Sequence, residues 1–138
     1  MDELLNPSNC LCSNLRRSAR KLTRIYDAAL GRVGINVGQF ATLATLAAMG
    51  ETTISELAEA LELERTALTR NLSVLERNGL VSSRAGEDRR ERRISLSAQG
   101  SKSFADAVPL WERAQSYAID AMGARNASAL LDQMNKLA

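Results

Sequence analysis

Residues 66–100 read TALTRNLSVLERNGLVSSRAGEDRRERRISLSAQG, and this stretch decides the fold. Near its start, Leu68, Leu72 and Leu75 recur at intervals of four and three residues, which is the spacing of one helix face. The pattern predicts a helix over 65–78 with these leucines packed inward. The polar and cationic side chains between them are then expected to face outward.

A β-hairpin is predicted directly after this helix. Asn78-Gly79 is a typical helix end. Residues 80–83 and 94–96 have the composition and alternation of short strands. Seven consecutive charged residues, Glu87–Arg93, lie between these two segments. The hairpin should therefore have a strongly charged tip.

A shorter helix is predicted immediately upstream. Thr53 followed by Glu56 matches the capping-box pattern, and apolar residues at helical spacing continue to Leu61. A break near Leu63 and Glu64 separates this helix from the next. Two short helices followed by a β-hairpin form a winged helix-turn-helix. The predicted fold class is therefore mainly α with a small β-wing.

Apolar periodicity and glycine breaks predict four further helices, at 8–30, 37–49, 98–122 and 125–137. The helix 37–49 is almost entirely apolar and should be buried. Asn36 is expected to cap its N-terminus. Pro109 should bend the helix 98–122 or start a new segment there.

Charge is distributed unevenly along a chain whose formal net charge is only +2. Residues 51–64 carry five acids and no bases, whereas residues 65–93 carry eight arginines and four acids. Residues 16–24 carry five bases and no acids. Local basic blocks in a nearly neutral chain indicate surfaces that meet an anion.

Composition excludes several classes of function. The 138 residues contain no histidine and two cysteines, so a histidine triad is impossible and a zinc site is not expected. No glycine-rich phosphate loop or catalytic carboxylate pair is found, and we expect neither an enzyme nor a cofactor. No apolar run reaches 18 residues and the N-terminus is acidic. We therefore expect a cytoplasmic protein without membrane contact.

The motifs of residues 66–100 resemble those of the MarR family of bacterial transcription regulators. They match its recognition helix, its Leu-Glu-x-x-Gly-Leu-Val link at Leu75–Val81, its Asp-x-Arg wing tip at Asp88–Arg90 and its closing Leu-Ser-x-x-Gly at Leu96–Gly100. The resemblance covers almost the whole chain. It implies a sequence-specific repressor that binds a pseudo-palindromic operator in double-stranded DNA as a homodimer with intertwined first and last helices. Residues 1–36 with 98–138 would then form a helical dimerisation region, and residues 37–97 the DNA-binding lobe.

The chemistry of the motif agrees with this resemblance. A recognition helix enters the major groove, where arginine grips guanine and threonine contacts bases or a thymine methyl group. On the wing, Arg90 is expected to reach the minor groove, Asp88 to orient nearby arginines, and Arg89, Arg92 and Arg93 to meet phosphates. The predicted DNA-binding residues are Arg65, Thr66, Thr69, Arg70, Ser73, Arg77, Asp88, Arg89, Arg90, Arg92 and Arg93.

Plainer interpretations stay open at this point. A charged tip alone is compatible with a solvated loop, and the outward helix face with an ordinary polar surface. A winged helix that holds another protein and ignores DNA is a second class of function. A steep loss of DNA affinity with rising salt would discriminate between these classes, because phosphate contacts release counterions.

Two cysteines lie near the start of the first predicted helix. Cys12 precedes Tyr26 by fourteen residues, which resembles the organic-hydroperoxide-sensing branch of the family. There the cysteine is oxidised and the tyrosine hydrogen-bonds it. Arg16 stands where that branch has a second tyrosine, and a nearby arginine lowers a thiol pKa. The departure at Arg16 weakens the resemblance to the peroxide pocket but is compatible with redox sensing. One hypothesis is therefore redox sensing mainly through Cys12, with Cys10 resolving an oxidised Cys12 across the dimer; the alternative is that both are small buried apolar residues.

A small organic anion is the competing effector. Family members bind such ligands between the dimer helices and the DNA-binding lobe. The candidate pocket residues here are Arg16, Arg20, Tyr26, Phe40 and Trp111. The alternative for the aromatic residues is core packing, and for the arginines a solvated helix face.

Overall fold

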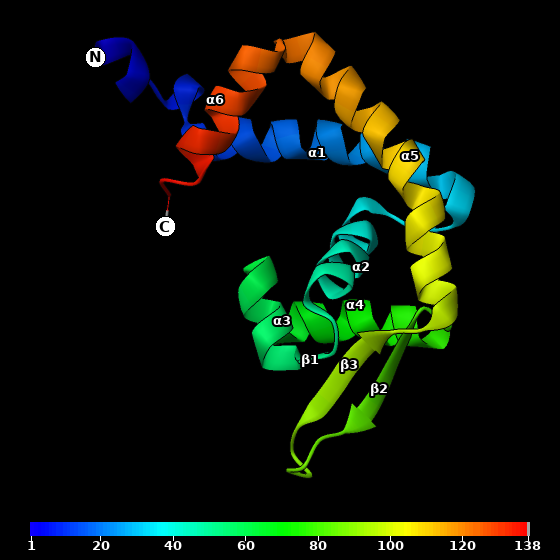
Figure 1. The fold of residues 1–138 in the computed structure, drawn as a ribbon. Helices are drawn as coiled ribbons and strands as arrows, with labels where there is room; N and C mark the ends of the chain where they lie inside the picture. The colour runs from blue at the N-terminus through cyan, green and yellow to red at the C-terminus, as the bar shows by residue number, and fades with distance from the viewer. Residues whose placement is uncertain (138) are drawn as a thin grey trace.

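The computed structural model describes residues 1–137 of the chain. Within that range the chain forms six α-helices, a three-stranded antiparallel sheet and three 3-10 turns (Figure 1). The helices are α1 (Leu11–Leu30), α2 (Val37–Met49), α3 (Ile54–Leu61), α4 (Arg65–Arg77), α5 (Ala98–Met122) and α6 (Ala124–Met134). The strands are β1 (Thr52–Thr53), β2 (Val81–Ala85) and β3 (Arg92–Leu96). The 3-10 turns are Asp2–Leu5, Pro7–Asn9 and Gly31–Val33.

The helices divide between the two ends of the molecule. Figure 1 shows α1 and α6 together at one end, beside both termini. The β2–β3 hairpin projects from the opposite end, next to α3 and α4. Helix α5 runs between the two ends and packs on both α1 and α2. The predicted winged helix-turn-helix is confirmed, with the wing at the far end from α1 and α6.

The sheet has the strand order β1-β3-β2. Val81 pairs with Leu96 and Ala85 with Arg92, so both hairpin strands extend further toward the tip than predicted. The two-residue strand β1 was not predicted; Thr52 pairs with Ile94. Strand β1 joins the end of α2 to the sheet, and the wing is therefore anchored at its base.

The first helix begins later than predicted. Residues 8 and 9 belong to the 3-10 turn Pro7–Asn9, and α1 starts at Leu11 with Cys10 as its N-cap. The Asn6 side chain accepts the Ser8 backbone N–H, so the chain before Cys10 is held in a local turn instead of a helix. Helix α6 is also shorter than predicted and ends at Met134.

Pro109 lies inside one continuous helix, α5, and does not start a new segment. Figure 1 shows that α5 changes direction along its length, so the predicted bend is present. Pro109 is exposed, and so is Ala105, whose carbonyl would have accepted the N–H that proline lacks. Water can serve that carbonyl, because this side of the helix is not packed.

The core lies where α2, α3, α4, β3 and α5 meet. Helix α2 is only partly buried, in contrast to the prediction: Phe40, Leu43 and Leu46 face the core, whereas its C-terminal end at Ala47–Met49 is exposed. Asn36 caps the helix as predicted, in a full capping box with Gln39. The rings of Phe40 and Trp111 stack at 5.7 Å, and Phe104 packs beside them at 5.4 Å from Phe40. The core therefore continues from the winged helix-turn-helix into α5.

Candidate nucleic-acid interface

Helix α4 presents one polar, cationic face. Leu68, Leu72 and Leu75 are buried as predicted, and they orient the rest of the helix. The outward side chains of the predicted DNA-binding set are all exposed: Arg65, Thr66, Thr69, Arg70, Ser73 and Arg77. The Ser73 hydroxyl donates to the backbone carbonyl of Thr69. The exposed face therefore consists of arginines and small hydroxyl side chains, which suit hydrogen bonding to base edges.

Five arginines around this face are free of carboxylates. Within residues 1–137 none of their guanidinium groups forms a side-chain hydrogen bond or an ion pair. They are Arg65, Arg70 and Arg77 on α4, and Arg89 and Arg90 at the wing tip. Unpaired exposed arginines leave a local positive potential, which attracts a polyanion.

Asp88 shapes the wing tip through the backbone. Its carboxylate accepts the backbone N–H of Arg90 at 3.0 Å, and its carbonyl accepts that of Glu91 at 2.9 Å. The Gly86 N–H also bonds the Glu91 carbonyl at 2.8 Å, which closes the tip. Asp88 thus orients Arg90 by fixing its main chain, and no ion pair of Asp88 with an arginine occurs within the described residues.

Arg92 and Arg93 lie on opposite faces of the sheet, because successive strand residues alternate. The Arg92 guanidinium donates to the Ser83 hydroxyl at 2.8 Å, and that hydroxyl donates to Glu76 of α4 at 2.7 Å. Arg93 faces the other way and is only half-exposed. Arg92 and Arg93, which were both predicted to meet phosphates, therefore lie on different faces of the wing.

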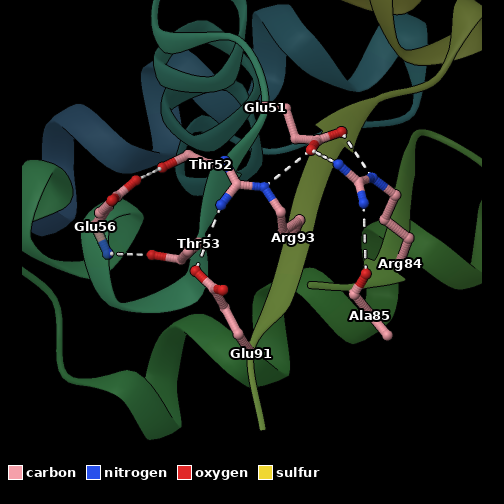
Figure 2. Close-up of polar contacts among 8 residues, drawn as sticks. All are labelled: Glu51, Thr52, Thr53, Glu56, Arg84, Ala85, Glu91 and Arg93. Atoms are coloured by element: carbon pink, nitrogen blue, oxygen red, sulfur yellow. Dashed lines mark hydrogen bonds and ion pairs between the residues drawn. The ribbon is translucent and has the colours of Figure 1, made fainter. Parts of the chain in front are cut away.

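On that second face the guanidinium group of Arg93 is paired with the carboxylate of Glu51, as Figure 2 shows. Glu51 accepts the Arg93 Nε at 2.9 Å and also binds Arg84 through Nη2 at 2.5 Å and Nε at 3.2 Å. These arginines hold the pKa of the Glu51 carboxyl below its usual range, Arg84 most strongly. The Glu56 carboxylate accepts the Thr52 hydroxyl, which lowers its pKa as well. Sequence reasoning missed Glu51 and Arg84, since neither lies in the recognition helix or the wing tip.

A cleft separates the wing from the helix-turn-helix. Its volume is about 400 Å³, and Arg65 from the start of α4 and Arg90 and Arg92 from the wing line it together. The start of α3 forms the remaining wall. The tertiary fold therefore brings the predicted helix and wing residues to the two sides of one hollow.

The two cysteines are exposed, so the alternative that they are small buried residues is wrong for the single chain. Cys10 caps α1, with its Sγ accepting the Ser13 N–H at 3.5 Å. Hydrogen bonds from the Ser13 side chain and backbone lower the pKa of the Cys10 thiol. This thiolate-favouring environment at Cys10 was not predicted.

Tyr26 lies far from Cys12 in the same chain. Fourteen helical residues correspond to about 21 Å along the axis, so a Cys12–Tyr26 hydrogen bond cannot form within one subunit. The Tyr26 hydroxyl donates instead to Gln115 of α5, and burial raises the Tyr26 pKa. Tyr26 and Gln115 line an apolar hollow of about 120 Å³ between α1, α5 and α6.

The remaining ligand-pocket candidates do not come together around this hollow. Phe40 and Trp111 belong to the aromatic core stack. Arg16 and Arg20 are exposed on α1. Within residues 1–137 no cluster of side chains is suited to hold a metal ion, and no helix there is both long enough and apolar enough to cross a membrane.

Known transcription regulators are similar to this chain in sequence. Residues 35–91 match the sequence profile of the MarR family. The HTH-type transcriptional regulator YwoH of Bacillus subtilis is 31% identical over 94 residues, 68% of this chain and 69% of that protein. The organic hydroperoxide resistance transcriptional regulator of the same organism is 33% identical over 93 residues, 67% of this chain and 63% of that protein.

A solved structure extends the similarity over nearly the whole chain. The M. tuberculosis transcriptional regulator MosR in complex with DNA has a TM-score of 0.80 and 42% identity, covering 92% of this chain and 96% of that one. The fold and its arginine-rich face thus define a winged helix-turn-helix DNA-binding transcription regulator. The chain belongs to the MarR family.

Proposed function

We propose that the protein is a homodimeric repressor that places α4 of each subunit in the major groove of a pseudo-palindromic operator and Arg90 in the adjacent minor groove. The five unpaired arginines carry this proposal, because they are exposed on α4 and at the wing tip, and Arg65 and Arg90 line the same cleft from its two sides. The side chains proposed to contact bases are Arg65, Thr66, Thr69 and Arg70. Ser73, Arg77, Arg89 and Arg92 are proposed to bind phosphates.

DNA binding is tested with a labelled duplex that the wild-type protein selects from a random library. Arg70→Ala should weaken binding by about 1–3 kcal/mol and relax the sequence preference at one base position. Arg125→Ala, at the exposed start of α6 far from the wing, is the matched control and should bind as the wild type does. Equal weakening by both variants would contradict the proposed interface. Failure of the wild type to select any duplex from the library, at any salt concentration, would favour a protein-interaction module.

Exposed apolar side chains support the dimer. Leu11 on α1, Leu131 on α6 and Leu137 beyond it are 72%, 54% and 74% exposed in the single chain. Figure 1 places both helices at the end opposite the wing. A second copy covering them would remove this apolar surface from water. We therefore propose 1–36 with 98–138 as the dimerisation region and 37–97 as the DNA-binding lobe.

Molecular mass in solution tests this division. Leu131→Glu should shift the protein toward monomer, because a buried unpaired carboxylate is costly at an interface. Met49→Glu places the same charge on a 42% exposed methionine at the end of α2 and should stay dimeric. A fully dimeric Leu131→Glu protein would contradict the proposed surface.

Oxidation of Cys10 or Cys12 is the effector mechanism we favour. Both thiols are exposed in the single chain, and the Ser13 contacts stabilise the Cys10 thiolate, the nucleophilic form. A hydroperoxide would transfer one oxygen to the thiolate, giving a sulfenic acid and releasing an alkoxide that takes up a proton. The relative in Bacillus subtilis whose name refers to organic hydroperoxide resistance supports this choice. Release would follow from a population shift toward dimers whose recognition helices no longer match the operator.

The decisive experiment compares operator binding before and after a mild organic hydroperoxide. We expect peroxide to release the wild type, and Cys12→Ser and Cys10→Ser to show which thiol is required. Persistent binding by the wild type would leave the hollow beside Tyr26 and Gln115 as the candidate effector site for a small organic ligand. Its lining is mostly apolar, which favours an aromatic or aliphatic body over a bare anion.

A further inference from the structure

Two arginines of the wing face each other across the β2–β3 pairing. Arg84 and Arg93 occupy directly opposed positions in the antiparallel register. Like charges in such positions repel and destabilise the pairing of the strands. The Glu51 carboxylate lies between the two guanidinium groups and bridges them (Figure 2). The repulsion is thereby replaced by two attractive contacts.

Glu51 comes from outside the hairpin. It follows Gly50, which ends α2 with a positive φ of 74°, and it precedes β1. Its two oxygens bind Arg84 in the bidentate manner, and one of them also accepts the Arg93 Nε. One side chain thus ties the end of α2 to both strands of the wing.

The opposite face of the wing has its own attachment. There Arg92 contacts Ser83, and Ser83 contacts Glu76 of α4. On the Glu51 face, Arg93 also reaches Glu91 at 3.4 Å, closer to the tip. The hairpin is therefore held to α4 on one face and to the α2–β1 junction on the other, with Arg90 beyond both attachments.

We propose that Glu51 is a positioning residue for DNA binding, which holds the wing at the angle that lets Arg90 enter the minor groove. This role depends on the contact between Arg90 and the minor groove that is part of the proposed function. Glu51 does not touch DNA in this arrangement, because both of its oxygens are occupied by arginines on the face that points away from α4. It acts through Arg84 and Arg93.

Simple electrostatics predicts the opposite change in DNA affinity when the charge of Glu51 is removed, which makes the proposal testable. Removing a negative charge from a DNA-binding lobe and releasing two arginines should strengthen binding to a polyanion. Loss of a positioning contact should weaken it. Glu51→Gln is the informative variant because it keeps the shape of the side chain and removes the charge. Glu87→Gln is the matched control, since Glu87 is exposed on the same wing beside Arg84 and Arg93, and its side chain forms no hydrogen bond or ion pair within residues 1–137.

The experiment measures affinity for the duplex selected by the wild-type dimer as a function of salt. We expect Glu51→Gln to bind about tenfold more weakly, which corresponds to the loss of one good contact. The slope of log affinity against log salt should fall by about one unit, as for the loss of one phosphate-neutralising arginine. Glu87→Gln should bind as well as the wild type or better. Arg90→Ala, measured alongside, should match Glu51→Gln in both quantities.

Amide hydrogen exchange of the free dimer provides the second readout. The β2 and β3 amides should exchange faster in Glu51→Gln, while those of α4 remain protected. If Glu51→Gln binds the duplex as well as the wild type or better, while Arg90→Ala binds it more weakly, the positioning role is rejected. The proposed contact of Arg90 with DNA then stands. Wild-type affinity in Arg90→Ala rejects the wing contact itself, and with it any role for Glu51 in placing Arg90.

Discussion

The first turn of α5 rests directly on the backbone of Leu80. A Cβ atom on Gly100 would lie 1.8 Å from the Leu80 carbonyl oxygen, a distance that no side chain can occupy. The Ser97 N–H also donates to that carbonyl at 3.1 Å, and the Ser97 hydroxyl bonds the Gly79 carbonyl. The closing Leu-Ser-x-x-Gly motif therefore has a structural meaning: it joins α5 to the link between α4 and the wing.

Gly100→Ala should therefore destabilise the protein. The added methyl group forces α5 away from Leu80, and overpacking of this kind costs about 1–3 kcal/mol. Denaturant unfolding at a fixed protein concentration measures the change. Gly38→Ala is the control, because its Cβ would come no closer than 3.4 Å to a neighbouring atom and alanine favours the helix α2. Equal stability of the two variants would show that the α5 contact is not rigid.

Leu75→Ala should remove core packing beneath the recognition helix. Leu75 is 0% exposed, and truncation of such a leucine costs about 2–5 kcal/mol because a cavity remains. Leu63→Ala deletes the same atoms at a 42% exposed position before α4 and should cost much less. Urea unfolding of both variants checks the difference. Comparable losses of unfolding free energy in the two variants would mean that packing of the buried leucines does not hold α4 in place.

The reactivity of Cys10 should depend on Ser13. Hydrogen bonds from the Ser13 side chain and backbone lower the Cys10 pKa, so the thiolate persists to lower pH than usual. In Ser13→Ala the pH at which iodoacetamide modifies Cys10 at half its maximal rate should move upward. Mass spectrometry of the Cys10 peptide measures it, with Ser18→Ala, exposed further along α1, as the control. An unchanged profile would remove the structural reason for thiolate formation at Cys10.

The contribution of Glu51 to stability should be lost in acid. Its pKa is lowered in the folded protein, chiefly by Arg84, relative to about 4.3 for an ordinary glutamate. The stabilisation is therefore complete above the unfolded-state pKa and disappears as the pH falls through the lowered folded-state pKa. The difference in unfolding free energy between wild type and Glu51→Gln, measured over a pH series, should shrink in that window. In an Arg84→Met background the difference in unfolding free energy caused by Glu51→Gln should be smaller. A difference that does not change with pH would contradict the ion pairs of Glu51 with Arg84 and Arg93.

Local patterns were sufficient for most of the fold. The spacing of Leu68, Leu72 and Leu75 and the stop at Gly79 predicted α4 to within one residue, because helix periodicity and a left-handed terminal residue are encoded locally. Ser97 predicted the start of α5 for the same reason. The short strand β1 was missed because two threonines become a strand only through pairing with β3. The start of α1 was misplaced because Asn6 and Pro7 form their own turn.

The candidate site was only partly readable from sequence. Exposure of the α4 residues followed from the leucine spacing, and strand alternation already separates Arg92 from Arg93. The distance between Cys12 and Tyr26 follows from helix geometry alone. The core position of Phe40 against Trp111, however, depends on the packing of α2 on α5, which no local pattern specifies.

The sequence by itself determined the winged helix-turn-helix and the arginine content of its surface, since both depend on residue type and on spacing along the chain. Tertiary structure alone decided which of those arginines are available. Arg84 and Arg93 bind Glu51 across 33 and 42 residues of sequence, whereas Arg70 and Arg90 meet no carboxylate within the described chain. An ion pair depends on distance in space, and only folding of the α2–β1 junction against the wing brings that carboxylate within reach.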